Sequence, residues 1–210
     1  MLYVCKECGQ TSPKKMGKCF RCGKWDAFVL ENNDLKTKKV INTNKTLTKI
    51  SHTNAEKVKE FTTNINEMDR VLGRGMVGGS TILIGGEPGI GKSTLLLQLA
   101  LQLQRKILYV SGEESPQQIK RRAQRLDFNT SNCFILSETQ TQTLFEHVKK
   151  LNPALLIIDS IQTLNTQQID SSAGSVSQIR ACTNELIRYA KATHTPVILV
   201  GHITKDGTLA

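Results

Sequence analysis

The chain has 210 residues, with 28 Lys and Arg against 18 Asp and Glu, six cysteines and 39% hydrophobic residues. This length accommodates one domain of about 150 residues plus a smaller unit, and it excludes two large domains. The longest apolar run, residues 154–158, is much shorter than the roughly 18 residues of a membrane span, and the N-terminus lacks an export signal. We therefore expect a soluble, cytoplasmic protein that makes no membrane contact.

The net charge of +10 is concentrated near the N-terminus. Residues 1–60 contain 13 Lys and Arg against 6 Asp and Glu, whereas residues 61–210 contain 15 against 12. Clustered basic residues favour a nucleic acid partner, because binding releases condensed counterions. A solvated basic linker explains the same charge equally well, so charge alone leaves both interpretations open.

Four of the six cysteines form two Cys-x2-Cys pairs separated by ten residues. They are Cys5, Cys8, Cys19 and Cys22. This spacing predicts four thiolates around one zinc ion, and a glycine after each pair, Gly9 and Gly23, lets backbone N–H groups face the sulfurs. Disulfides are the weaker alternative in a reducing compartment. Cys133 and Cys182 have no such partners, and we expect them to be buried structural thiols.

Metal binding would supply most of the folding free energy of this small unit, because it has few apolar residues to bury. These are Leu2, Val4, Phe20, Trp25 and Phe28. The following segment, residues 31–60, is rich in Asn, Thr and Lys and poor in apolar residues, which is typical of a linker. We therefore expect a zinc ribbon over residues 1–30 and a basic linker over residues 31–60.

From residue 61 onward, short apolar runs alternate with segments of helical periodicity. The expected strands are residues 80–84, 106–110, 133–136, 154–159 and 197–200. The expected helices are residues 92–104, 116–126, 141–151 and 175–193. Apolar strands alternating with helices predict an α/β fold with a mainly parallel sheet and right-handed crossovers.

Residues 86–93 follow the first of these strands and have the pattern Gly-x4-Gly-Lys-Ser. In a strand–loop–helix context, this pattern directs backbone N–H groups and a helix N-terminus at phosphate oxygens. We expect Lys92 to reach the β- and γ-phosphates of ATP and Ser93 Oγ to bind Mg²⁺. The candidate nucleotide-binding residues are Gly86, Glu87, Pro88, Gly89, Ile90, Gly91, Lys92, Ser93 and Thr94. A merely tight glycine turn is the alternative.

Acidic residues follow two other strands of the predicted sheet. Asp159 ends the strand of residues 154–159, where it could orient Mg²⁺ through water or simply cap a loop. Glu113 and Glu114 follow the strand of residues 106–110, and one of them could act as general base toward the attacking water. Their alternative role is that of helix-entry acids favoured by the helix dipole.

His202 follows the last expected strand and could hydrogen-bond the γ-phosphate and couple its loss to the next loop, or it could cap that loop. We include it with Lys92, Glu113 and Glu114 among the candidate catalytic residues. Basic residues also gather on the helix of residues 116–126, where they either face DNA or are solvated, with the solvated interpretation slightly favoured. They are Lys120, Arg121, Arg122 and Arg125.

A cysteine ribbon, a basic linker and a phosphate-loop core in this order resemble the bacterial RadA (Sms) family of RecA-like DNA repair ATPases. The resemblance rests on the four cysteines with Trp25 and on six further motifs that together span the chain. These motifs are residues 69–73, 85–98, 111–115, 159–163, 174–178 and 200–205.

The resemblance implies a RecA-like P-loop ATPase core over residues 61–210 that uses ATP, Mg²⁺ and Zn²⁺ in DNA repair and recombination. It implies a motor that binds single-stranded DNA, drives branch migration of recombination intermediates, works with a recombinase and forms a homo-hexamer in its full-length form. By this likeness, the loop of residues 161–175 lies near a central channel and faces DNA.

The sequence departs from the family pattern in two places. The family usually has a tryptophan shortly before the second cysteine pair, where this chain has Lys15 and Met16. The family's Lys-Asn-Arg-Phe-Gly motif and C-terminal Lon-protease-like domain are absent from these 210 residues. RecA-type sites are completed by basic residues of a neighbouring subunit, so we expect this polypeptide to bind nucleotide, hydrolyse it poorly and form no stable ring.

Two other functions compete with the recombination motor. A zinc-dependent module that binds DNA or a protein partner and only senses nucleotide would need the same ribbon and phosphate loop. A small-molecule P-loop kinase is less favoured, because the chain has no lid-like insert and carries a ribbon that such a kinase does not need.

Overall fold

The computed structural model describes residues 3–30, 49–52, 60–126 and 132–202. The chain divides into two compact units, Met1–Lys59 and Glu60–Ala210. Within the described ranges, no helix is long and apolar enough to cross a membrane. Most of the segment expected to be a linker lies outside the described residues, so the three expected domain boundaries stay predictions.

The first unit contains a small antiparallel sheet with the strand order β2-β1-β3. Its strands are β1 (Tyr3–Cys5), β2 (Thr11–Ser12) and β3 (Phe28–Leu30), and a short 3-10 helix, η1 (Ile50–His52), follows. The core of the unit contains Cys5, Cys19, Ala27 and Phe28. The expectation that Phe20 and Trp25 are buried is wrong, since they are 64% and 75% exposed. Leu2 lies outside the described residues.

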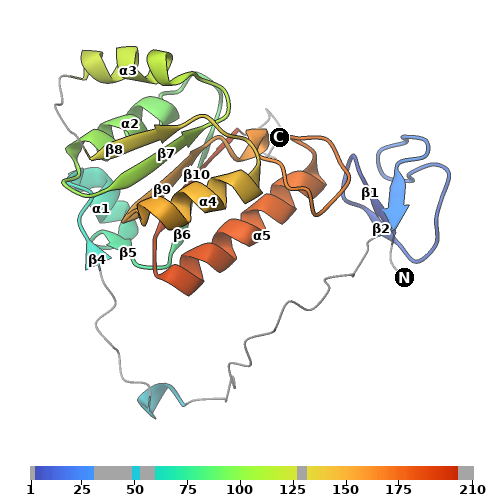
Figure 1. The fold of residues 1–210 in the computed structure, drawn as a ribbon. Helices are drawn as coiled ribbons and strands as arrows, with labels where there is room; N and C mark the ends of the chain where they lie inside the picture. The colour runs from blue at the N-terminus through green and yellow to red at the C-terminus, as the bar shows by residue number, and fades with distance from the viewer. Residues whose placement is uncertain (1–2, 31–48, 53–59, 127–131, 203–210) are drawn as a thin grey trace. The chain divides into compact units, whose positions relative to one another are not determined.

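The second unit is built on a five-stranded sheet in which every neighbouring pair is parallel, in the order β6-β10-β9-β7-β8 (Figure 1). The strands are β6 (Thr81–Gly86), β7 (Ile107–Ser111), β8 (Cys133–Leu136), β9 (Leu155–Asp159) and β10 (Val197–His202). The predicted α/β fold with a parallel sheet is confirmed.

Helices cover both faces of this sheet and bury two separate apolar clusters (Figure 1). Helices α1 (Asn66–Leu72), α2 (Lys92–Gln102) and α3 (Pro116–Arg125) pack on one face, and α4 (Thr141–Leu151) and α5 (Val176–Thr193) on the other. Because successive side chains of a strand point to opposite faces, Ile157 of β9 joins the first cluster and Ile158 the second.

The four expected helices and five expected strands all occur, with ends that differ by up to two residues. Helix α3 begins where predicted because Ser115 forms a capping box with Gln118 and proline occupies the first turn. Both β6 and β10 run two residues further toward their carboxyl ends than expected. Helix α1 was not expected from the sequence, and neither was the short antiparallel pair β4 (Glu60–Phe61) and β5 (Met76–Val77) that flanks it.

Candidate nucleotide site and metal centre

The predicted phosphate loop connects the end of β6 to the start of α2. Gly89 and Gly91 have φ values of 81° and 102°, which lie in the left-handed region that glycine adopts without a steric penalty. Lys92 is the first residue of α2, so the N–H groups of the first helical turn face the loop. The local structure therefore provides the converging backbone donors that bind phosphate oxygens.

The side chain of Lys92 is folded into this loop and is only 8% exposed. Its Nζ donates to the carbonyl oxygens of Gly86 and Glu87, both at 2.7 Å. A Cβ atom on Gly86 would lie 3.5 Å from Lys92 Cδ and 3.3 Å from Ile90 Cγ2, so glycine leaves room for the lysine stem. The ammonium group is thereby held inside the loop, where phosphate oxygens would bind.

The other candidate residues lie at the same edge of the sheet. In the parallel register, Ser111 of β7 lies opposite Asp159 of β9, and His202 of β10 lies opposite Gly86 of β6. The carboxyl ends of four parallel strands thus meet beside the phosphate loop, which is where open α/β sheets bind ligands.

Tyr109 connects Asp159 to the phosphate-loop helix. Its hydroxyl lies 2.5 Å from Asp159 Oδ2 and donates to it, and it lies 3.4 Å from the carbonyl oxygen of Ser93. Burial, followed by the negative charge of Asp159, raises the pKa of Tyr109 above its usual value, so the hydroxyl keeps its proton. Tyr109 was not among the residues expected in the site, because a tyrosine within an apolar strand is expected simply to pack in the core.

Glu113 contacts the residue that follows Asp159 and the last residue of β10. Glu113 Oε1 accepts a hydrogen bond of 2.9 Å from Ser160 Oγ and lies 3.5 Å from His202 Nε2. Gln162 Nε2 donates to the carbonyl oxygen of His202 at 3.2 Å. The structure therefore brings Glu113 and His202 together and connects both to the segment that follows β9.

The neighbouring carboxylate, Glu114, has a different set of contacts. It forms an ion pair with Arg122 of α3, and its backbone N–H donates to Ser111 Oγ at 3.0 Å. Arg122 is therefore a partner of Glu114, while Lys120, Arg121 and Arg125 on the same helix are exposed. Of the two adjacent glutamates, Glu114 pairs with the last turn of α3, and Glu113 contacts residues at the ends of β9 and β10.

A close backbone approach holds the segment after β7 against the segment after β9. A Cβ atom on Gly112 would lie 2.2 Å from Thr163 Oγ1 and 2.5 Å from Thr163 Cβ. The backbone N–H of Gly112 donates to the carbonyl oxygen of Asp159 at 3.3 Å. Only glycine fits at position 112 without a shift of η2 (Ile161–Thr163).

The loop that follows η2 is anchored by the buried side chain of Gln178 in α5. Its Oε1 accepts from the N–H of Thr166 at 2.9 Å. Its Nε2 lies within 3.3 Å of the carbonyl oxygens of Thr166, Ile169 and Ser171. Thr166 Oγ1 also donates to Glu185 at 2.8 Å. One amide therefore fixes the backbone of a loop that contains neither helix nor strand.

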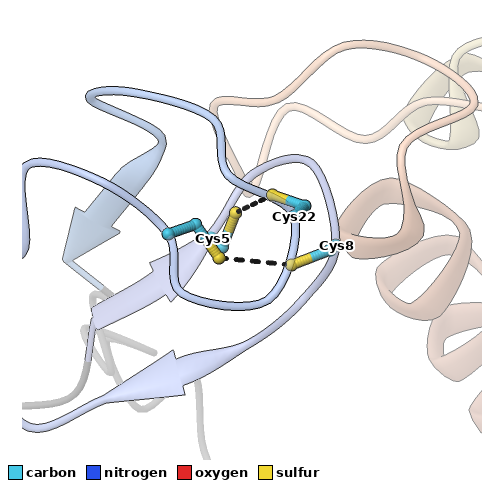
Figure 2. Close-up of side chains that lie close together, drawn as sticks. Cys5, Cys8 and Cys22 are labelled. Atoms are coloured by element: carbon cyan, nitrogen blue, oxygen red, sulfur yellow. Dashed lines mark hydrogen bonds between the residues drawn. The ribbon is translucent and has the colours of Figure 1, made fainter.

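The four predicted zinc ligands lie together in the first unit. Their sulfur atoms all lie within 4.8 Å of one another. The Cys5–Cys22 and Cys8–Cys19 pairs are 3.7 and 3.6 Å apart, and Figure 2 shows the sulfurs of Cys5, Cys8 and Cys22 turned toward one another. Four sulfurs at Zn–S distances of about 2.3 Å in a tetrahedron would be about 3.8 Å apart, so the cluster fits a zinc ion.

The backbone around Cys19 favours its thiolate. Backbone N–H groups of Cys22 and Arg21 donate to the sulfur of Cys19 and lower the pKa of its thiol to about 6, whereas burial raises the pKa of the Cys5 and Cys8 thiols. Gly9 and Gly23 have φ values of 71° and 72°, which allows the turn that each cysteine pair requires. Both observations agree with the predicted knuckle geometry.

The two remaining cysteines lie in the second unit. Cys182 is fully buried and Cys133 is half-buried. Burial raises the pKa of Cys182 to about 12 and that of Cys133 to about 11, so neither thiol ionises near neutral pH. The expected structural role fits Cys182 best, because Cys133 is only partly enclosed.

Comparison with protein families gives two matches that agree with these sites. The model of an AAA domain matches residues 47–208, and that of a rubredoxin metal binding domain matches residues 3–29. Among solved structures, a KaiC-like protein from Pyrococcus horikoshii is similar, with a TM-score of 0.60 and 20% sequence identity, over 73% of this chain and 74% of that protein. This likeness supports the RecA-like fold.

Several bacterial proteins named DNA repair protein RadA are similar over essentially the whole chain. Those of Campylobacter jejuni, Bacillus subtilis and Rickettsia felis are 45%, 42% and 46% identical over 100%, 99% and 99% of this chain. The chain spans about half the length of each, between 48% and 49%. The chain therefore belongs to the AAA domain family and, within it, to the family of bacterial RadA DNA repair proteins.

Proposed function

We propose that this chain is the nucleotide-binding and zinc-binding part of an ATP-driven DNA repair motor, which binds single-stranded DNA and promotes branch migration of recombination intermediates. The similarity to RadA proteins supports the repair role. The observation that carries the ATPase assignment is the continuous set of contacts at one sheet edge. It runs from Ser93 through Tyr109 to Asp159, and from Ser160 through Glu113 to His202.

In this proposal, residues 86–94 bind the phosphates of ATP. Backbone N–H groups of the loop and of the first turn of α2 face the β-phosphate, and Lys92 exchanges its two carbonyl acceptors for phosphate oxygens. Ser93 Oγ and Asp159 would hold Mg²⁺, Asp159 through water, and the ion would neutralise charge that develops on the phosphates.

Glu113 is the general base of the proposed reaction. Its side chain is 53% exposed, so water can reach it, and Ser160 and His202 hold its carboxylate at the strand ends. Glu114 was an equal candidate on sequence grounds, but its ion pair with Arg122 occupies its carboxylate. We therefore assign the catalytic role to Glu113 and a helix-positioning role to Glu114.

His202 would hydrogen-bond the γ-phosphate and couple its loss to the loop that follows β9. Its side chain contacts Glu113, and its carbonyl oxygen accepts from Gln162 in η2. Residues 161–175 would then transmit the change from bound ATP to hydrolysed ATP to the bound DNA, while the hydrogen bonds of Gln178 hold the loop backbone in place. In the longer relatives, we propose a homo-hexamer with DNA in its channel and a recombinase as partner.

An ATPase assay with and without single-stranded DNA tests the proposal. The expected result is ATP binding that is lost in Lys92→Ala, together with slow hydrolysis that rises when single-stranded DNA is added but stays below the rate of a full-length relative. Binding without any turnover, in the presence or absence of DNA, would favour a nucleotide-sensing module. Turnover that depends on a small-molecule acceptor instead of DNA would favour a kinase.

A further inference from the structure

The second cysteine pair lies in a segment that exposes its large side chains. We call residues 13–26 the ribbon tip; all of them are exposed except Cys19. Phe20 is 64% exposed and Trp25 is 75% exposed, whereas Phe28 of the same unit is 2% exposed. A unit this poor in buried apolar residues gains stability from every aromatic ring that it encloses, so two rings left in solvent point to a binding surface.

The ribbon tip is also strongly basic. It contains five basic residues and a single acid, Asp26, which pairs with Lys15 at 3.7 Å. The basic residues are Lys14, Lys15, Lys18, Arg21 and Lys24. Four thiolates and one Zn²⁺ would add a formal charge of −2, which leaves the tip positive. A partner that complements this surface is therefore a polyanion.

The backbone fixes the position of Trp25. Lys18 and Trp25 pair across an antiparallel bridge, and the ammonium group of Lys18 lies 5.5 Å from the centroid of the indole ring. The N–H of Asp26 donates to the carbonyl oxygen of Gly17 at 2.6 Å, and that of Cys19 to Lys24 at 2.8 Å. Because Cys19 and Cys22 lie within this hairpin, zinc binding would hold it in place, and the ring is presented in a defined orientation before any partner binds.

We propose that the ribbon tip binds single-stranded DNA, with unpaired bases stacked on Trp25 and Phe20 and with the surrounding lysines and Arg21 contacting phosphates. This inference rests on the proposed binding of single-stranded DNA and assigns a surface to it. A flat aromatic face accepts a base only when that base is unpaired and unstacked from its neighbours, which a duplex does not offer. The combination of exposed rings and positive charge therefore selects single strands over duplex DNA.

Trp25 is the only tryptophan of the chain, so its fluorescence reports directly on this surface. The test is a titration of the zinc-loaded chain with a thymidine oligonucleotide, with a duplex of equal phosphate concentration and heparin as comparisons. Saturable quenching by the single strand, but not by the duplex or heparin, is expected. Equal quenching by heparin would overturn the stacking assignment.

Variants separate this surface from DNA binding elsewhere, with binding measured by the anisotropy of labelled oligonucleotide. Phe20→Ala and Trp25→Ala should each weaken binding by about tenfold, and Trp25→Phe by less, because a phenyl ring still stacks. Phe134→Ala is the matched control, since this ring is 41% exposed on β8 in the other unit. Zinc content, measured for each variant, should equal that of the unchanged chain.

The outcomes distinguish this inference from the proposed function. If the oligonucleotide binds with normal affinity to Phe20→Ala and Trp25→Ala and leaves Trp25 fluorescence of the unchanged chain unaltered, the ribbon tip is not the binding surface, while the proposed DNA binding stands. If the unchanged chain does not bind the oligonucleotide at all, both proposals are wrong.

Discussion

Replacing Tyr109 with phenylalanine removes one hydroxyl from the centre of the proposed site and leaves the ring in place. The hydroxyl donates to Asp159 Oδ2 at 2.5 Å, and the residue is 1% exposed. A hydrogen bond to a charged group contributes about 1.5–3 kcal/mol, and solvent cannot replace the lost donor at a site this buried. We therefore expect Tyr109→Phe to lower the free energy of unfolding by about 1.5–3 kcal/mol.

The same change should weaken Mg²⁺-dependent nucleotide binding, since a carboxylate that has lost its fixed donor holds the ion less well. Removing such an orienting partner typically costs about tenfold or more in metal affinity. The assay is a titration of Mg²⁺ at constant ATP, followed by a fluorescent nucleotide analogue, alongside urea unfolding. Tyr189→Phe is the matched control, because this half-buried tyrosine packs against Phe145 within the other apolar cluster.

The two measurements decide between a positioning role and a merely structural one. A loss of stability with no change in the Mg²⁺ concentration for half-maximal binding would refute the reasoning, because it would show that Asp159 does not depend on Tyr109 for its function. An equal shift in Tyr189→Phe would refute it as well.

Three further predictions follow from other contacts. Gln178→Ala should destabilise the second unit by about 3 kcal/mol, because several hydrogen bonds of about 1 kcal/mol each are lost. It should also speed proteolysis within residues 164–175, and an unchanged rate of cleavage there would contradict the anchoring role of Gln178. Gly112→Ala should lower the free energy of unfolding, measured in urea, by about 1–3 kcal/mol, because the new methyl group clashes with Thr163. Adding Thr163→Gly should restore the lost stability, whereas a single variant of unchanged stability would contradict the close approach. Cys5→Ser should remove zinc, detected by metal analysis, and unfold the ribbon while the thermal midpoint of the second unit stays constant; retained zinc would contradict the four-cysteine site.

The phosphate loop and the parallel sheet could be predicted because their signals are local. Residues 86–93 carry a loop pattern between an apolar strand and a helical period, and both elements occur where expected. The cysteine cluster is equally local, since spacing alone brings four sulfurs together. Elements α1, β4 and β5 were missed because they are short, and their conformation depends on contacts such as those of Thr62 and Thr63 with Asp69.

Features that depend on tertiary contacts could not be predicted. Glu113 and Glu114 are adjacent in sequence, and only tertiary contacts distinguish them: Arg122 of α3 pairs with Glu114, whereas Ser160 and His202 contact Glu113. The apolar pattern around Tyr109 indicates a core residue, and only the pairing of β7 with β9 places Asp159 beside its hydroxyl. Trp25 was expected to be buried because it is apolar, yet the hairpin that carries the second cysteine pair turns it outward.

The most direct test of the central claim is single-turnover hydrolysis of radiolabelled ATP by Glu113→Gln and Glu114→Gln, compared with the unchanged chain in the presence of single-stranded DNA. Glutamine preserves the size of each side chain but removes the carboxylate that accepts a proton, and such general-base catalysis contributes about 10²–10⁴-fold to a rate. We expect Glu113→Gln to bind ATP normally and to lose hydrolysis by a factor in this range, and Glu114→Gln to retain most of its rate. Unchanged hydrolysis in Glu113→Gln, or a selective loss in Glu114→Gln, would contradict the assignment of the site.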